Sequence, residues 1–514
     1  MSATHPITGA CATASSPSSL LRLSLAAAAV LAMSACSTIQ PTALTSQALG
    51  EATKADGQAI QKGVEPITGA LTLEDAMARA LKHNLFRRGK MMEEALAFRQ
   101  FDASKRDMLP KLLAEAGYHW RDNDKISQSR DAATGTLSPS RFISQDRDHH
   151  TRGLEFTWSL LDLSLGYYGT RQEADRVLIA SERRRKAMHQ LMQDVRTAYF
   201  RALAAQKLQG DITRTIAVAE EALKDARAAE AQRVRSPLDS LRYQRQLLEN
   251  VRLLEAIGQE LAVAQVELAQ LINAPLGKAI VLADQSVRDL SDSLLKLPVA
   301  KMEESVLANN PDLREAHYNS RIAREEVRRT LARMFPNISL NWGVKYDSDS
   351  YLVNKDWQEA GLQFSFNLFN LLTGPMQVQM AEAGVDLADQ RRVTMQLAVL
   401  TQMHLARQGL QTAREQFQRA DAIWSIDRKI ADMVSTREAA QAQSKLDVVS
   451  NATSATLGLL RRYQALAQVQ AAENRLLATL GMDPQIGSVD DLSVRQISDQ
   501  LKKQFESLPA QMLR

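Results

Sequence analysis

Residues 337–346 read NISLNWGVKY, and apolar and polar side chains alternate through this stretch without interruption. Ile338, Leu340, Trp342, Val344 and Tyr346 occupy every second position, with polar residues or glycine between them. Successive side chains of a β-strand point to opposite faces of its sheet. The stretch therefore predicts a strand with one apolar and one polar face, in a chain that elsewhere has the pattern of long helices.

The composition of the 514-residue chain excludes several classes of protein. The formal net charge of +4 is too small to indicate a nucleic-acid partner. Aromatic residues make up only 5% of the chain, and the apolar content is rich in alanine and leucine, which favours helices. The two cysteines, Cys11 and Cys36, are too few for a disulfide framework or a cysteine-based zinc finger.

The N-terminus has the pattern of an export signal. Residues 20–35 read LLRLSLAAAAVLAMSA, an apolar run too short and too rich in alanine to indicate a membrane-spanning helix. The run ends at Cys36 and resembles a bacterial lipobox, although Met33 stands where leucine is usual. We expect residues 1–35 to be a lipoprotein signal peptide, Cys36 to be lipidated, and residues 36–70 to form an extended segment. An ordinary export signal with an unmodified cysteine is the alternative.

A long-period repeat divides the rest of the chain. The segment MLPKLLAEAGYHW from Met108 matches MFPNISLNWGVKY from Met334 at an offset of 226 residues, and SPLD at 236–239 matches SKLD at 444–447 at an offset of 208. The offset falls by 226 − 208 = 18 residues between the two strands of each half, which predicts an exposed polar loop at residues 121–151. The expected divisions are a first repeat at 71–296, a second repeat at 297–484 and a C-terminal tail at 485–514.

Each repeat predicts a long helical hairpin. Residues 170–234 contain no proline and only one glycine, Gly210, so about 65 helical residues would span roughly 100 Å. Helices of this length need a coiled-coil-like partner along their whole length. We expect the two hairpins at about residues 168–273 and 375–481.

Four strands of about ten residues complete the two repeats, at about residues 111–121, 153–163, 336–346 and 360–369. This is the length of a tilted strand that crosses a bilayer. We expect the apolar faces to contact lipid and the polar faces to line a water-filled lumen; two hairpins packed on a soluble core are the alternative. The predicted lipid-facing residues are Tyr118, Trp120, Phe156, Trp158, Leu340, Trp342, Phe364 and Phe366.

Four strands cannot close a barrel on their own. A bilayer tolerates no open sheet edge, because unpaired backbone groups in hydrocarbon cost several kcal/mol each. Single-chain barrels begin at about eight strands. The missing strands must come from other copies, so we expect a symmetric ring. The residues themselves do not choose between two, three or more copies.

Two repeats of two strands and a long helical hairpin, with S-x-L-D at each hairpin turn, resemble the TolC family of outer-membrane factors over about residues 70–484. The resemblance implies a mainly α fold with a small β part, in which antiparallel coiled-coil hairpins form an α-barrel. Trimerisation would complete the four strands of each chain to a transmembrane barrel. The implied location is the bacterial outer membrane, with a lipid anchor and a long periplasmic portion.

The same resemblance implies a function and partners. The protein would be the passive exit duct of a tripartite efflux pump or a type I secretion system. Its partners would be outer-membrane lipid, a periplasmic adaptor (membrane fusion) protein and an inner-membrane transporter. The adaptor would dock on the hairpin tips, at Ser236, Pro237, Leu238, Ser444 and Leu446.

Aspartates at the hairpin turns are the candidate gate residues. The resemblance implies that Asp447 rings the periplasmic mouth of a trimer, with Asp239 as its counterpart in the first repeat. Such a ring attracts cations and repels anions. Ser450 stands where some members of the family have a second aspartate. A helix N-terminal residue favoured by the backbone dipole is the alternative role of Asp447.

No catalytic or cofactor-binding motif is present in the sequence, so we expect neither an enzyme nor a cofactor or metal. His149 and His150, close to Asp146 and Asp148, predict an exposed polar loop, with a loop metal site as the alternative. The basic run ERRRK at 182–186 predicts a solvated helix face. A lipid-anchored coiled-coil protein of structural or adhesive function, without a pore, is the second functional hypothesis.

Overall fold

A computed structural model describes residues 42–232, 236–283, 291–440, 444–483 and 489–512 of the chain. It divides into two units, residues 1–64 and residues 65–514. The described part of the first unit is exposed and contains helix α2, Ser46–Gln61. The predicted signal peptide, Cys36 and residues 37–41 lie outside the described residues. The rest of the predicted extended segment is described, and the prediction is wrong over residues 46–61, which form α2 behind a Thr45 side-chain cap.

The second unit follows the predicted order of helix, strands and helical hairpin twice. In the first half α3 (Leu73–His83), α4 (Leu85–Ser104) and the short 3-10 helix η1 (Lys105–Met108) precede the strands, and α5 and α6 follow them. In the second half α7 (Ser291–Leu295), α8 (Val299–Asn309) and α9 (Pro311–Arg333) precede the strands, and α10 and α11 follow. Helix α12, Val494–Met512, comes last.

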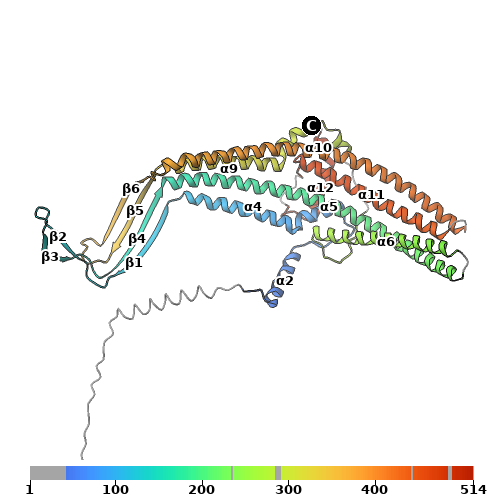
Figure 1. Cartoon of the computed structure of the whole chain (residues 1–514), viewed down its shortest axis with the longest axis horizontal. Coiled ribbons are helices and arrows are strands. Elements are labelled where there is room, and N and C mark those ends of the chain that lie inside the picture. The colour runs from blue at the N-terminus through green and yellow to red at the C-terminus, as the bar shows by residue number, and fades with distance from the viewer. Residues whose placement is uncertain (1–41, 233–235, 284–290, 441–443, 484–488, 513–514) are drawn as a thin grey trace, which may run out of the picture. The chain divides into compact units, whose positions relative to one another are not determined.

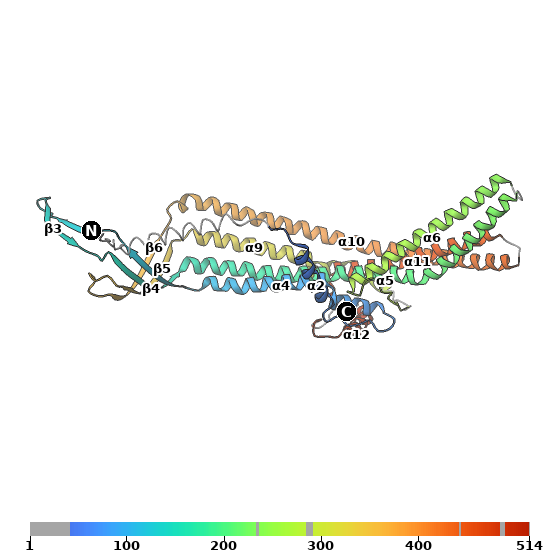
Figure 2. The ribbon, with the colours of Figure 1, turned by 90° about the horizontal axis from the view of Figure 1, so that it is seen from below.

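The long helices form two hairpins. Helix α5 runs over Leu160–Ala231 and α6 over Pro237–Leu271, while α10 runs over Asn370–Ala439 and α11 over Lys445–Thr479. The 72 residues of α5 correspond to about 110 Å of helix. Within this unit, the sheet continues directly into α5 at one end, and the two hairpin turns lie at the other end (Figures 1 and 2).

One antiparallel sheet has the strand order β1-β4-β5-β6. Its strands are β1 (Lys111–Trp120), β4 (Asp148–Ser159), β5 (Asn337–Asp347) and β6 (Asp356–Ser365). The sheet therefore joins the two halves through β4 and β5, and leaves β1 and β6 as its edges.

Two strand positions predicted from the alternation are wrong by about four residues. The second strand ends at Ser159 instead of continuing to 163, because the Ser159 hydroxyl caps the next helix by accepting the N–H of Asp162 at 3.0 Å. The fourth strand ends at Ser365, before a turn in which the Asn367 side chain accepts the N–H of Phe369. The apolar alternation runs on into the first turn of α5 after the second strand, and into the turn that precedes α10 after the fourth.

The polar stretch predicted as an exposed loop contains a second, two-stranded sheet. Strands β2 (Ile126–Arg130) and β3 (Leu137–Ile143) pair in an antiparallel hairpin. Its turn is closed by the Asp131 carboxylate, which accepts the backbone N–H groups of Ala133 and Thr134 at 2.8 and 3.0 Å. The residues of this hairpin are almost all exposed, as the prediction required, but they are ordered by their own backbone pairing.

Equivalent residues of the two halves make the same contacts where the helices meet. Asn84 caps α4 and donates from its side chain to the Leu271 carbonyl at 2.9 Å, while Asn310 caps α9 and donates to the Thr479 carbonyl at 3.0 Å. Just past these acceptors, Asn273 and Gly481 both have positive φ, at 51° and 69°. The 226- and 208-residue offsets of the sequence thus recur in capping and in backbone conformation.

The main core lies where these helices converge, away from the sheet. Its largest fully buried side chains include Tyr199, Phe200 and Leu208 of α5, against Met77 and Leu81 of α3. The Tyr199 hydroxyl donates to the main chain at the parallel bridge between Leu71 and Leu282, where it lies 3.1 Å from the Leu71 carbonyl oxygen. A second cluster joins α8, α9, α10 and α11.

The basic run at 182–186, predicted as a solvated face, is solvated only at Arg183 and Lys186, whereas Glu182 is buried. Arg183 pairs with Glu315 at 2.7 Å, Arg184 with Glu94 at 2.6 Å and Lys186 with Asp312 at 2.8 Å, so the run ties α5 to α4 and to α9. The helical period spreads neighbouring positions around the helix axis, and both flanking helices carry acidic partners.

Candidate channel wall and hairpin tips

The apolar residues predicted from the alternation share one face of the four-stranded sheet. Directly opposed residues in an antiparallel sheet point to the same side. The opposed sets are Leu112–Phe156–Trp342, Leu154–Val344, Trp158–Leu340–Leu362 and Ile338–Phe364. We call this surface the apolar face; most of its large side chains are exposed, for example Trp342 at 41% and Phe364 at 68%.

The structure places most of the predicted lipid-facing residues within the strands. Tyr118 and Trp120 lie near the end of β1 and are 62% and 48% exposed, and Phe156 in the middle of β4 is half-buried. Phe366 lies one residue beyond β6 and is half-buried, so it does not belong to a strand. The sequence pattern misplaced Phe366 because the alternation continues past the last ladder hydrogen bond.

The opposite face of the same sheet is polar and charged. Lys345 of β5 forms an ion pair with Glu359 of β6 at 2.6 Å. Glu115 of β1 and Glu155 of β4 lie on the same face. Asn341 and Thr157 occupy opposed positions near its middle. A sheet with one apolar face and one charged face can separate a hydrocarbon phase from an aqueous one.

His149 lies in strand β4 and is only 8% exposed, so the prediction of an exposed loop at this residue is wrong. Its Nδ1 lies 2.7 Å from Asp347, its Nε2 lies 2.9 Å from the Gln145 amide, and its ring stacks on His119 at 4.9 Å between centroids. The sequence did not reveal this pairing, because the partners come from β1, from β5 and from the segment that precedes β4. Within the described residues, no group of three or more His, Cys, Asp or Glu side chains is placed to hold a metal ion.

The turn of the second hairpin is closed by a capping box. The Ser444 hydroxyl accepts the N–H of Asp447 at 3.2 Å and donates to the Asp447 carboxylate at 2.7 Å. The Asp447 carboxylate also accepts the Ser444 N–H at 3.4 Å. The alternative role of Asp447 as a helix N-terminal residue is therefore present in the structure, and it does not conflict with a place at the mouth of a ring.

The turn of the first hairpin is built differently. Pro237 opens α6 as its first residue, and the Ser236 side chain makes no capping hydrogen bond. Asp239 is 68% exposed at its side chain and lies 3.9 Å from Arg242. Leu238 is 57% exposed, whereas Leu446 of the second tip packs against the small core of Ala219, Ala222, Leu247 and Val449. Arg233 and Gln441, which precede the two turns, lie outside the described residues.

Lys445 is a tip residue that sequence reasoning missed. Its ammonium group reaches back to α5 and lies 3.0 Å from Glu221 and 2.8 Å from Asp225. The hydrogen bond to Asp225, and to a smaller extent the one to Glu221, raises the pKa of Lys445 well above its usual value. The contact joins the second hairpin to the first one. A lysine two residues before Asp447 carried no signal, because its partners lie more than 200 positions away in the sequence.

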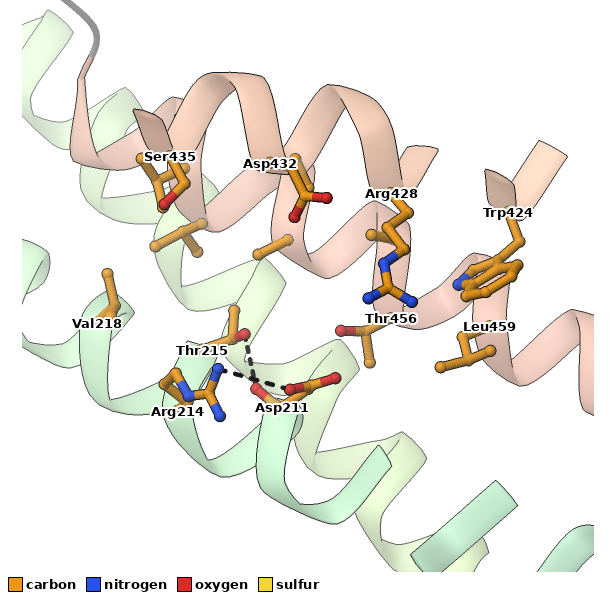
Figure 3. Close-up of a pocket in the computed structure, with 15 residues that line it drawn as sticks. Asp211, Arg214, Thr215, Val218, Trp424, Arg428, Asp432, Ser435, Thr456 and Leu459 are labelled. Carbon is orange, nitrogen blue, oxygen red and sulfur yellow. Dashed lines mark hydrogen bonds and ion pairs between the residues drawn. The ribbon is translucent and has the colours of Figure 1, made fainter. Parts of the chain in front are cut away.

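A cavity of about 440 Å³ lies between α5, α10 and α11 behind the tips (Figure 3). Trp424 of α10 lies over it, with the guanidinium of Arg462 5.0 Å and that of Arg428 5.6 Å from its ring. On the α5 side, Asp211 and Arg214 are 3.8 Å apart. The cavity wall is thus mixed, because guanidinium groups lie near the Trp424 ring on one side and a charge pair lies on the α5 side.

No helix among the described residues combines the length and the apolar character needed to cross a bilayer.

Comparison with known proteins agrees with this architecture. Residues 303–482 match the family model described as "Outer membrane efflux protein". This part of the chain is therefore similar to outer membrane efflux proteins. The predicted resemblance to the TolC family is confirmed by this match and by the solved structures with which the chain shares its fold.

Three of these structures are outer-membrane channels with low sequence identity. They are the OprN channel (TM-score 0.60, 16% identity, 80% of this chain and 89% of that one), the Campylobacter jejuni CmeC channel (0.62, 13%, 91% and 98%) and the Neisseria gonorrhoeae MtrE channel in its open state (0.57, 15%, 82% and 94%). At such identities the likeness shows the fold: a mainly helical α-barrel chain with a small strand part.

A sequence relative is the "Probable outer membrane lipoprotein SilC" of Salmonella typhimurium. It is 29% identical over 269 residues, which are 50% of this chain and 51% of that protein. The matched part of this chain therefore spans about half the length of the curated relative.

Proposed function

We propose that this chain is the outer-membrane exit duct of a tripartite efflux pump or a type I secretion system. The observation that carries the proposal is the two-sided sheet. Its large apolar rows lie on one face, and Glu115, Glu155, Lys345 and Glu359 lie on the other. Charged residues reach the apolar face only at the end of the sheet away from the helices, at Asp148, Arg152 and Asp356. Strand β4 runs directly into the 72 residues of α5, and β6 leads through a short turn into the 70 residues of α10. A pore wall needs both faces, whereas an adhesive stalk without a pore has no use for a charged inner face.

The assembly we propose is a homotrimer. Strands β1 and β6 each have one neighbour in the sheet of a single chain. Hydrocarbon does not solvate bare peptide edges, so β1 of one copy would pair with β6 of the next until the cylinder closes. The fold shared with the channels above supports three copies of this chain.

The remaining parts of the proposal concern location and partners. The location is the outer membrane, with acyl chains on Cys36 and a long periplasmic portion formed by α5, α6, α10 and α11. A periplasmic adaptor would dock at the hairpin tips, where Ser236, Pro237, Leu238 and Ser444 are exposed, and would couple the duct to an inner-membrane transporter. Asp447 would face the periplasmic mouth, with Asp239 beside it. The proposed conduit is passive, and energy would enter at the transporter.

Two measurements on the full chain test the proposal. Outer-membrane fractions should contain a trimer that converts to monomer on heating before gel electrophoresis. The purified trimer should give single-channel steps in a planar bilayer. A protein that stays monomeric and gives no steps would refute the duct and would favour the lipid-anchored coiled-coil alternative.

A further inference from the structure

A cavity of about 320 Å³ lies where the apolar face of the sheet meets the helices. It is formed by the first residues of α5 and the last residues of α9, close to the start of β5. The apolar part of its wall consists of Leu160, Leu161, Leu331, Ala332, Phe335 and Ile338. Ile338 also belongs to the apolar face, opposite Phe364, so the cavity is continuous with that face.

The apolar wall is unusually open. Leu160 is 48% exposed, Leu331 is 41% exposed and Phe335 is 68% exposed. An apolar recess of this kind is unfavourable when it faces water, because apolar surface stabilises a structure only when it is removed from water. An apolar occupant is therefore expected.

The polar side chains of the cavity all lie at its helical end. Ser164 and Tyr168 lie about one and two turns along α5 from Leu160. At the rise of an α-helix, Tyr168 is about 12 Å along the helix axis from Leu160. Arg328 of α9 lies about two turns before Phe335. The cavity thus changes from apolar beside the sheet to polar along the helices.

The helical end also carries an excess positive charge. Arg328 and Arg171 lie 2.9 Å and 3.1 Å from the same carboxylate, that of Glu325. Two guanidinium groups share one carboxylate, so this cluster has a net charge of +1. The Glu325 side chain is 7% exposed, whereas that of Arg328 is 53% exposed and remains accessible to a second anion. A phosphate is the anion that a guanidinium binds best, through paired hydrogen bonds.

We infer that this cavity binds one phospholipid of the periplasmic leaflet, with an acyl chain along Leu331, Phe335 and Ile338 and the headgroup phosphate at Arg328. The inference rests on the proposed membrane placement of the sheet. A neighbouring copy would not cover the cavity, because copies would meet at the edge strands β1 and β6. The cavity belongs to α5, α9 and β5, in the middle of the chain's own wall.

The test uses the full-length protein in vesicles of phosphatidylethanolamine that contain a small share of phosphatidylglycerol with a photoactivatable acyl chain. After illumination, labelled peptides are quantified by mass spectrometry. Peptides that contain residues 160–168 and 331–338 should be labelled. Labelling there should fall several-fold in Ala332→Trp, which fills the cavity, and in Arg328→Gln, which removes the phosphate partner.

Arg324→Gln is the matched control. Arg324 lies one turn earlier on α9, pairs with Asp389 at 3.1 Å and has 52% of its side chain exposed, but it does not line the cavity. Arg328→Gln leaves Arg171 on Glu325, so it should fold even if Ala332→Trp does not. Equal labelling at the cavity in all variants, with sheet peptides still labelled, would overturn the inference alone. Absence of label from the sheet peptides would overturn the membrane placement, and the inference with it.

Discussion

Single residues set how the helices of this molecule meet. Asp483, which follows α11, accepts hydrogen bonds from Arg185 and His189 of α5. The His189 Nε2 lies 2.6 Å from the Asp483 carboxylate, and Arg185 also donates to Glu182. Burial by itself would raise the pKa of Asp483. The hydrogen bonds from His189 and Arg185 outweigh burial and hold that pKa below its usual value.

The depressed pKa predicts acid sensitivity at this junction. A carboxyl group whose pKa is lower in the folded protein than in the unfolded chain stabilises the folded state. Its full contribution is present when the pH is above the unfolded-state pKa of about 3.9, and it is lost as the pH falls through the folded-state pKa. Asp483→Asn should therefore lower the free energy of unfolding by about 1.5–3 kcal/mol near neutral pH, and the loss should shrink below about pH 4. Denaturant unfolding at several pH values measures both effects. A loss that does not change with pH would contradict this role of the carboxylate.

Trp342 tests the apolar face at one position. Trp342→Lys places a charge near the middle of the proposed lipid-facing surface, which costs about 2–4 kcal/mol and should reduce trimer in the outer membrane. Asn341→Lys is the control, because Asn341 is the adjacent residue of β5 and points to the polar face. Gel quantification of the heat-sensitive trimer compares the two. Equal loss in both variants would mean that the faces are assigned incorrectly.

At the scale of elements, the two hairpin turns differ although their sequences match. Pro237 starts α6 without a side-chain cap, whereas Ser444 and Asp447 start α11 with a reciprocal one. The second turn is also tied to α5 through Lys445. The tips of the two halves therefore have different local restraints, and the second tip is the more firmly attached to the other hairpin.

The gate prediction for Asp447 can be separated from its capping role. Asp447→Asn removes the carboxylate charge and should weaken the preference of the channel for cations in bilayer conductance. Ser444→Ala is the matched control, because it breaks the same capping box at a cost of about 1 kcal/mol but leaves the charge. If both variants change selectivity equally, or neither does, Asp447 has no electrostatic role at the mouth.

At the scale of the whole molecule, anchoring and ring closure are separate proposals. Cys36→Ser should abolish palmitate labelling of the full chain, while closure of the sheet edges should still permit some trimer. Cys11→Ser is the control, since Cys11 precedes the predicted lipobox and would be removed with the signal peptide. Metabolic labelling followed by gel electrophoresis measures both properties. Palmitate that persists in Cys36→Ser would refute the lipobox interpretation.

The sequence by itself determined the repeat, the long helices and the two faces of the strands. These features depend on spacing within one element: every second residue in a strand, and three or four residues in a helix. The apolar set that includes Trp342 and Phe364 was readable for this reason, as was the absence of helix breakers through most of α5. Element ends were less certain, since the pattern at Phe366 continues where the hydrogen bonding stops.

Only the tertiary structure decided which distant residues meet. The stacking of His119 on His149, the reach of Lys445 to α5 and the ion pairs of the 182–186 run all join positions that no periodic pattern connects. The cavity between α5 and α9 arises in the same way. Side-chain contact depends on three-dimensional distance, and sequence spacing reports that distance only within a single helix or strand.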